Sequence, residues 1–277
     1  MDEYKGYKEI QMTDSDMALF YEGKYHIESD FVENEYLIIK NDDGKIVDKK
    51  CYQNGKFRNL YDRLSLDTVY FGRIHPRNLQ QELAFDMLQD NTSKIKMLTG
   101  KFGVGKDFLM IAHALKEIEE GKADKIIWVR NNVEVKDTAS IGFLPGSLYE
   151  KMIPWLGPFI DHCGDMEGVS RLMEEHKLEV VHLGFIRGRD FKNSIILSTE
   201  DENLTKEQFQ LLIGRVGEGS QLWLNSDNKQ RDKKVFEDSQ GTEILIDKLK
   251  GNRNFGYIKL EKTERSEIAA LADLLDK

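Results

Sequence analysis

Gly100, Gly105 and Lys106 have the residue types and the spacing of a phosphate-binding loop. They fit the template G-x-x-x-x-G-K, with an apolar stretch before it and a helical pattern after it. In such a loop the backbone N–H groups converge on phosphate oxygens, the glycines permit positive φ, and the lysine supplies a mobile cation. A glycine-rich turn that carries a lysine by chance needs neither flanking element. The segment therefore predicts a nucleoside triphosphate site.

The residue after the lysine departs from the template, which has Ser or Thr there to bind magnesium, whereas this chain has Asp107. A second acidic strand end is needed, and residues 195–203 are the good candidate, with Thr199-Glu200 in place of the usual Asp-Glu pair. Glu200 is then placed to polarise water. Alternatively, these acids begin a helix at Leu204, where negative charge suits the helix dipole.

The two departures are consistent with one exchange around magnesium. The hydroxyl and the carboxylate trade places between the loop and the strand, so Asp107 and Thr199 become the expected metal ligands and the total ligand charge is kept. The rival reading is a site that binds ATP but turns it over poorly.

Four further residues are candidates for acting on the terminal phosphate. Asp227 and Gln230 follow the apolar stretch 221–225, where Gln230 would sense the phosphate and Asp227 would orient it. An ordinary polar turn explains the same residues. Arg215 and Arg265 are candidates to stabilise transition-state charge, although any one arginine is more often a surface ion-pair partner.

Basic residues occur in two local groups that suit the phosphates of a nucleic acid. The first group is Arg187, Arg189 and Lys192, and the second is Lys229, Arg231, Lys233 and Lys234. Phe143, Trp155 and Phe159 are candidates for base stacking, with a place in the core as the alternative.

The whole chain has the composition of a folded protein. It has 277 residues, of which 40% are hydrophobic and 32% charged, enough for one large domain and a small one. A net charge of -9 argues against a protein that coats nucleic acid by bulk charge. Cys51 and Cys163 lack metal-ligand spacing and are expected to be free thiols. With no signal peptide or membrane span visible, we expect a cytoplasmic protein.

The pattern of polar and apolar residues divides the chain into three segments. Residues 1–30 are expected to form a polar arm or a lone short helix. Residues 31–75 predict a small β module, with strands at 36–40, 45–52 and 69–71 and a hairpin turn at Asn54-Gly55. Residues 76–277 alternate strands with helices, which indicates a parallel sheet covered on both faces. The expected strands lie at 97–99, 125–130, 180–185, 194–198, 221–225 and 256–260. The expected helices lie at 79–89, 108–120, 148–163, 206–216 and 264–276, the third of them interrupted around Pro154 and Pro158.

With these residues in hand, residues 76–277 resemble the PhoH-like ATPases, which are related to superfamily-1 helicase cores. The resemblance rests on Pro76 to Gln81, the phosphate loop, residues 141–155, Arg187-Gly188-Arg189, residues 215–220 and the closing segment 260–267. Asp107, Asn131, Thr199 and Ser226 depart from the family pattern.

The resemblance implies a RecA-like fold and a set of nucleotide contacts. Gln81 is implied to read adenine, and Arg265 to act on the γ-phosphate, in the same or a neighbouring subunit. The other implied nucleotide contacts are Gly100, Phe102, Gly103, Val104, Gly105, Lys106, Asp107, Phe108 and Asp227.

We therefore expect a protein that binds and hydrolyses ATP with Mg2+ and acts, helicase-like, on RNA or single-stranded nucleic acid. Superfamily-1 helicases place ATP between two such cores, and this chain has one. A ring of copies, hexameric as in relatives, would supply the second wall. The alternative is a nucleotide-gated binding and assembly module with little or no ATP turnover.

Overall fold

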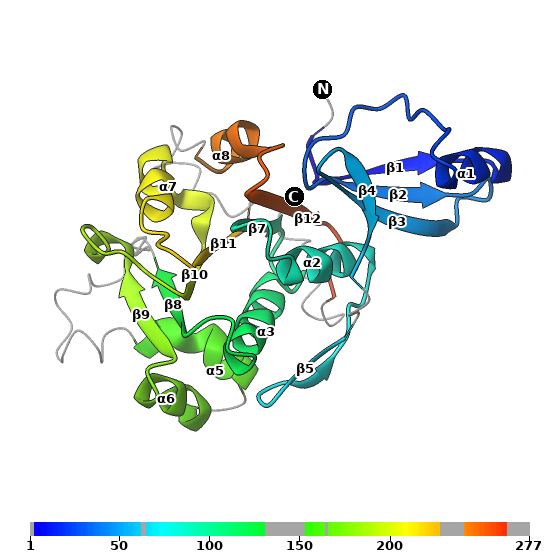
Figure 1. Cartoon of the computed structure of the whole chain (residues 1–277). Helices are drawn as coiled ribbons and strands as arrows, with labels where there is room; N and C mark the ends of the chain where they lie inside the picture. Colours follow the sequence, from blue (N-terminus) through cyan, green and yellow to red (C-terminus); the bar gives the residue numbers. More distant parts are fainter. Residues whose placement is uncertain (1–2, 62–64, 131–152, 164–165, 228–240, 265–277) are drawn as a thin grey trace, which may run out of the picture.

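The computed structural model of the chain describes residues 3–61, 65–130, 153–163, 166–227 and 241–264. Its centre is a six-stranded, all-parallel sheet in the order β12-β7-β11-β10-β8-β9 (Figure 1). The strands are β7 (Ile95–Gly100), β8 (Lys125–Arg130), β9 (Leu178–His182), β10 (Ser194–Thr199), β11 (Gln221–Ser226) and β12 (Phe255–Leu260). Both β10 and β11 are buried along their whole length, as strands covered on two faces must be.

Helices cover both faces of this sheet, which confirms the predicted α/β, RecA-like class (Figure 1). On one face pack α2 (Leu79–Gln89), α3 (Lys106–Glu119), α5 (Gly157–Cys163) and α6 (Met166–Glu174). On the other face pack α7 (Lys206–Ile213) and α8 (Gly241–Leu249). Side chains of alternate strand residues divide between the two cores, so Trp128 and Trp223 lie on the α3 face and Val129 and Leu224 on the α7 face.

A second, four-stranded sheet forms the β-rich module in the order β1-β2-β3-β4. It contains β1 (Tyr7–Gln11), β2 (Tyr36–Lys40), β3 (Ile46–Gln53) and β4 (Lys56–Asn59), with helix α1 (Asp14–Tyr21) after β1. The hairpin predicted at Asn54-Gly55 is present, with positive φ at both residues (53° and 75°). A separate hairpin, β5 (Leu66–Thr68) and β6 (Gly72–Ile74), lies against α3.

The N-terminal segment is part of the fold, which corrects the expected polar arm over residues 1–30. The short helix is there as α1, but β1 pairs in parallel with β2. Just before it, Lys5 accepts a backbone hydrogen bond from Lys259 on β12 (3.0 Å), and Tyr4 stacks on Tyr257. Gly6 has φ +83°, and a Cβ there would lie 1.8 Å from the Tyr257 carbonyl oxygen, so only glycine permits this approach.

Several other predicted elements need correction. Residues 69–71 are the turn between β5 and β6, and Val69 is 88% exposed. The strand expected at 180–185 lies at 178–182 and is followed by a 3-10 turn, η3 (Leu183–Phe185). Helix α7 ends at Ile213 with Gly214 as its C-cap, so it does not reach Val216, which instead bridges to Phe191. By contrast, the interruption expected around Pro154 and Pro158 is confirmed, because the described part of that helix divides into η2 (Ile153–Leu156) and α5. Residues 148–152 and 265–276 lie outside the described part.

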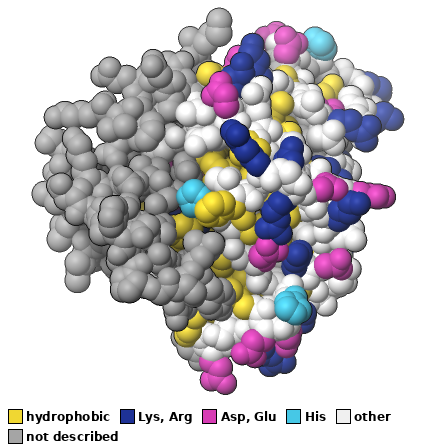
Figure 2. Space-filling view, turned by 90° about the vertical axis from the view of Figure 1, so that its left-hand side faces the viewer, with side chains coloured by type: hydrophobic (Ala, Val, Ile, Leu, Met, Phe, Trp, Pro, Cys, Tyr) yellow, Lys and Arg dark blue, Asp and Glu magenta, His cyan; other side chains and the backbone are white. Residues whose placement is uncertain are grey.

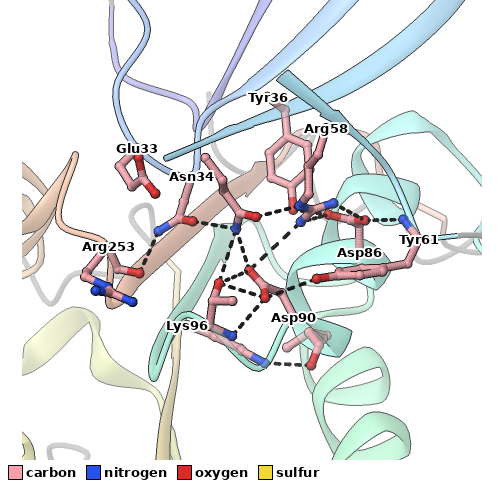
Figure 3. Close-up of polar contacts among 12 residues, drawn as sticks. Glu33, Asn34, Tyr36, Arg58, Tyr61, Asp86, Asp90, Lys96 and Arg253 are labelled. Carbon is pink, nitrogen blue, oxygen red and sulfur yellow. Dashed lines mark hydrogen bonds and ion pairs between the residues drawn. The ribbon is translucent and has the colours of Figure 1, made fainter. Parts of the chain in front are cut away.

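The β module is tied to the core through Asp86 of α2 (Figure 3). The Asp86 carboxylate accepts hydrogen bonds from both terminal nitrogens of Arg58 (3.0 and 2.8 Å), from the Tyr36 hydroxyl (2.7 Å) and from the Tyr61 backbone N–H (2.7 Å). Asn34 donates to the carbonyl of Phe255, at the start of β12 (2.9 Å). The module and the core therefore share one hydrophobic cluster and one polar anchor. Across the described ranges, no helix has the length and apolar content to cross a bilayer.

Candidate functional site

The predicted phosphate loop joins β7 to α3 at the carboxyl edge of the sheet. β7 ends at Gly100 and α3 begins at Lys106, with Gly103 and Gly105 at φ 84° and 90°. A Cβ on Gly100 would lie 2.2 Å from the Leu260 carbonyl oxygen, so glycine is required where the loop meets β12. Left-handed glycines on either side of Val104 turn backbone N–H groups into a concavity of the kind that holds phosphate.

Lys106 and Gln81 are both bonded to this loop. The Lys106 ammonium donates to the carbonyl oxygens of Gly100 (2.6 Å) and Lys101 (3.1 Å), so it lies over the loop. The Gln81 amide donates to the Val104 carbonyl (3.1 Å) and accepts from the Arg77 backbone N–H (2.9 Å). Gln81 thus braces the loop from the start of α2, and its implied contact with adenine stays a prediction.

A row of polar side chains lies at the strand ends beneath the start of α3. Arg130, Thr199 and Asn225 occupy matched positions in β8, β10 and β11, and they share the face on which α3 packs. Arg130 donates to the Thr199 hydroxyl (2.8 Å), and the Asn225 amide donates to the Asp107 carboxylate (2.5 Å). We call Arg130, Thr199 and Asn225 the strand-end row. Asn225 therefore lies between the two expected metal ligands, Asp107 and Thr199.

The acids after β10 have different surroundings. Glu200, at φ 60°, pairs with Arg130 (2.9 Å), and its side chain is 55% exposed. Asp201 is fully buried and accepts from the Ser198 hydroxyl (2.5 Å) and the Asn225 backbone N–H (3.1 Å). Burial raises the pKa of the Asp201 and Asp107 carboxyls.

These acids do not begin a helix at Leu204, so that alternative is wrong. They form the 3-10 turn η4 (Asp201–Asn203), after which α7 begins at Lys206 with Thr205 as its N-cap and Gln208 completing a capping box. The negative side chains face the sheet edge instead, where Glu202 accepts from the Asp227 backbone N–H (3.0 Å).

Other predicted contacts divide between the site and the core. Val104 is fully buried, while Phe102 is 66% exposed on the loop. Phe108 packs edge-on against Phe71 of the β5–β6 hairpin. Phe159 is buried against Trp128, so for this residue the core reading is correct. Phe143, Gln230, Arg265 and the second basic group, at residues 229–234, lie outside the described residues.

Arg215, a candidate to stabilise transition-state charge, lies near the amino ends of β10 and β11, away from the phosphate loop of its own chain. Its guanidinium donates to the Arg189 carbonyl (3.0 Å), and its carbonyl accepts from the Phe191 N–H. Phe191 and Val216 bridge one another just before β10 and β11 begin. A six-residue strand spans about 20 Å, so Arg215 could reach a phosphate loop only in another copy.

The first basic group lies on the connection from β9 to β10, residues 183–193. Arg189 pairs with Glu179 (2.6 Å) and lies over the Phe191 ring, and Lys192 is 3.8 Å from Asp190. Arg187 is exposed. Their contact with nucleic acid stays a prediction.

Arg130 and Asn225 are site residues that the sequence analysis missed. Each ends or nearly ends an apolar strand, which is where ligands bind in parallel α/β sheets. The signal available in the sequence was a polar residue at the end of each of these two apolar strands.

The donor set suits a magnesium ion that shares its coordination with phosphate. In the described ranges there is no group of three or more His, Cys, Asp and Glu side chains that could hold a metal. Mg2+ usually takes one or two carboxylates and completes its shell with water and substrate phosphates. For such an ion, Asp107 would supply the carboxylate and Thr199 a hydroxyl, which here accepts a hydrogen bond from Arg130.

Comparison with known proteins agrees with this geometry. The model of the family "PhoH-like protein" matches residues 73–273. The chain is 32% identical over 291 positions to Protein PhoH2 of Bacillus subtilis, covering 98% of this chain and 64% of that protein. It is 32% identical to Protein PhoH2 of Mycolicibacterium smegmatis over 74% of this chain and 47% of that one. A PhoH-like protein of Bacillus subtilis is 33% identical over 60% of this chain and 52% of its own length.

This chain therefore spans less than two thirds of the length of these relatives. Its phosphate-loop strand, loop and helix, and the strand-end row beside them, all fall inside the segment that the family model matches. The chain belongs to the PhoH-like protein family.

Proposed function

We propose that this protein binds ATP with Mg2+ in the loop between β7 and α3 and hydrolyses it. The observation that carries the proposal is the placement of Asp107 and the strand-end row together at one edge of the sheet. In this proposal the loop amides and Lys106 hold the phosphates, and Asp107 and Thr199 hold the metal. Bound Mg2+ would neutralise phosphate charge. Glu200, held by Arg130, would orient the attacking water.

We further propose that ATP turnover serves RNA or single-stranded nucleic acid in a ring of copies in the cytoplasm, six as in relatives. One core supplies one wall of the nucleotide site. In this proposal Arg215, which lies away from the phosphate loop of its own chain, would serve a neighbour's site. Arg265 stays the candidate to act on the γ-phosphate.

The rival proposal is a nucleotide-gated binding module with little or no turnover. It is favoured by one observation: the strand position beside Glu200 carries a hydroxyl that is engaged by Arg130, where a carboxylate would hold the metal more strongly.

Magnesium-dependent ATP hydrolysis, with and without oligouridylate, separates the two proposals. We expect measurable turnover that rises with RNA and disappears in Asp107→Ala. Lys116→Ala, on the same helix but at its far end, is the matched control and should keep wild-type turnover. Tight ATP binding with no hydrolysis under any condition would support the binding module and overturn the exchange of metal ligands.

A further inference from the structure

Three aromatic rings gather at the carboxyl end of the edge strand β9. His182, the last residue of β9, lies 5.8 Å from the Trp155 ring and 5.4 Å from the Phe185 ring, centroid to centroid. Phe185 is 62% exposed, which is unusual for so large an apolar side chain beside a buried strand. We call Trp155, His182 and Phe185 the ring cluster.

The backbone holds these rings in place. The His182 ring accepts a hydrogen bond from the Gly184 N–H (2.9 Å), which fixes the turn that presents Phe185. The indole N–H of buried Trp128 donates to the Trp155 carbonyl (3.1 Å). Leu156 and Leu183, the neighbours of these rings in the chain, are buried. These contacts hold the exposed face of the cluster in place, so a planar ligand can stack on it with little loss of side-chain and backbone entropy.

The strand-end row leads to the ring cluster. In register, His182 of β9 is the partner of Arg130 of β8, which is the partner of Thr199 of β10. The rings thus lie on the same sheet face as the proposed magnesium ligands, two strands away.

Arg187, two residues after Phe185 on the connection 183–193, is an exposed cation beside the cluster in the chain. Arg189 pairs with Glu179 near the start of β9, and Lys192, just before β10, is 3.8 Å from Asp190, so both lie toward the amino ends of these strands. Figure 2, which views the side of the molecule that carries β9, shows hydrophobic side chains in a band, with Lys, Arg, Asp and Glu side chains mixed beside it. Exposed rings next to cations are the surface that single strands need, with bases on the rings and phosphates on the cations.

We propose that the ring cluster is the platform on which bases of a single-stranded nucleic acid stack, with Arg187 binding the adjoining phosphate. This inference rests on the proposed function, because it locates the nucleic-acid site of the proposed ATPase. It adds a readout within the protein: of the three tryptophans, Trp128 and Trp223 are fully buried, so stacking would quench Trp155.

The test is binding of a fluorescein-labelled 12-nucleotide oligouridylate to the full chain, followed by anisotropy and by tryptophan fluorescence. We expect Phe185→Ala to weaken binding about tenfold, since one base stack is lost. Phe185→Tyr should bind within about twofold of wild type and serves as the conservative rescue. Tyr21→Ala, at a ring 57% exposed on α1 in the β module, is the matched control and should bind like wild type. In Arg187→Ala the salt slope should fall by about 0.7, whereas Arg253→Ala should keep it.

The outcomes separate this inference from the proposed function. If the wild-type chain binds the oligonucleotide and Phe185→Ala binds equally well, the platform is wrong while nucleic-acid binding stands. If the wild-type chain does not bind at low salt, the platform and the nucleic-acid part of the proposed function both fail. Sedimentation of each variant is the further check: loss of self-association in Phe185→Ala, with unchanged binding per chain, would make the rings a subunit contact and overturn the proposal.

Discussion

Arg58 and Arg130 make similar contacts in two regions with different tasks. Both side chains are mostly buried, at 23% and 15% exposure, and each joins separate elements through two terminal nitrogens. Arg58 bonds twice to one carboxylate, Asp86, which is 2% exposed and also receives Tyr36 and Tyr61. Arg130 divides its bonds between a hydroxyl and the exposed Glu200.

The difference indicates that the Arg58–Asp86 cluster stabilises the fold, whereas the strand ends around Arg130 carry groups that can contact a ligand. A buried carboxylate with four donors in a closed cluster is costly to disturb. At the strand ends, the carboxyls of Asp107 and Asp201 have raised pKa values because burial opposes their charge. Destabilised charge of this kind is common at functional sites, where a bound cation or proton relieves it.

The largest expected effect comes from breaking the anchor. Arg58→Ala leaves the Asp86 carboxylate buried without its main partner, and we expect the free energy of unfolding to fall by about 3 kcal/mol. Urea denaturation followed by circular dichroism measures it. The control is Lys49→Ala, which removes the less buried pair with Glu82 and should cost below about 1 kcal/mol. Equal losses of unfolding free energy in both variants would show that the Arg58–Asp86 anchor stabilises the protein no more than the Lys49–Glu82 pair does.

A smaller effect is expected on the pH dependence of stability, which should differ between the two buried aspartates Asp90 and Asp107. Burial acts to raise the pKa of Asp90 near the anchor, but hydrogen bonds from Thr92 and Gln53 outweigh it and leave the pKa lowered. Its ionised form therefore contributes stability above the ordinary pKa of 3.8, and that contribution is lost as pH falls through the lowered value. Burial raises the pKa of Asp107, so ionising it costs stability as pH rises above 3.8.

Asparagine at each position should then act in opposite directions. At pH 7 we expect Asp90→Asn to lower the melting temperature and Asp107→Asn to raise it, and both differences should shrink toward pH 3. Differential scanning calorimetry across pH 3 to 8 gives the result. If both substitutions change the melting temperature in the same direction at pH 7, the two regions do not differ in this way.

The smallest expected change in stability is at Arg130. Because Glu200 is exposed, Arg130→Ala should alter the free energy of unfolding by less than about 1 kcal/mol. Its expected effect is on catalysis: ATP turnover falls at least about tenfold, as the loss of a positioned charge does, while ATP affinity stays near wild type. Isothermal titration and a phosphate-release assay measure the two quantities. A loss of stability that matches Arg58→Ala would place Arg130 with the anchor.

The sequence patterns that predicted the core are local. The phosphate loop, α2 and β8 were predicted closely because each is a short apolar or glycine-rich run with clear ends. β1 was missed because its polar residues alternate with few apolar ones, and its place becomes visible only when it pairs with β2. Helix α8 was not among the predicted helices, and it follows residues that the structure does not describe.

The site was predicted in part for a similar reason. Asp107, Thr199 and Glu200 were found through the loop template and the acidic strand end. Arg130 and Asn225 join them only through strand register, which brings together residues far apart in the chain. The same register separates Arg215 from the loop, which no spacing in the sequence indicates.

The central claim is that the loop before Lys106 binds the triphosphate of ATP. Isothermal titration of ATP with Mg2+ into the wild-type chain, Lys106→Ala and the control Lys116→Ala tests it most directly. We expect binding by the wild type and by Lys116→Ala, with the affinity of Lys106→Ala weakened at least about tenfold, as loss of a charge-assisted phosphate contact implies. Equal ATP affinity in all three proteins, or no binding by the wild type, would contradict it.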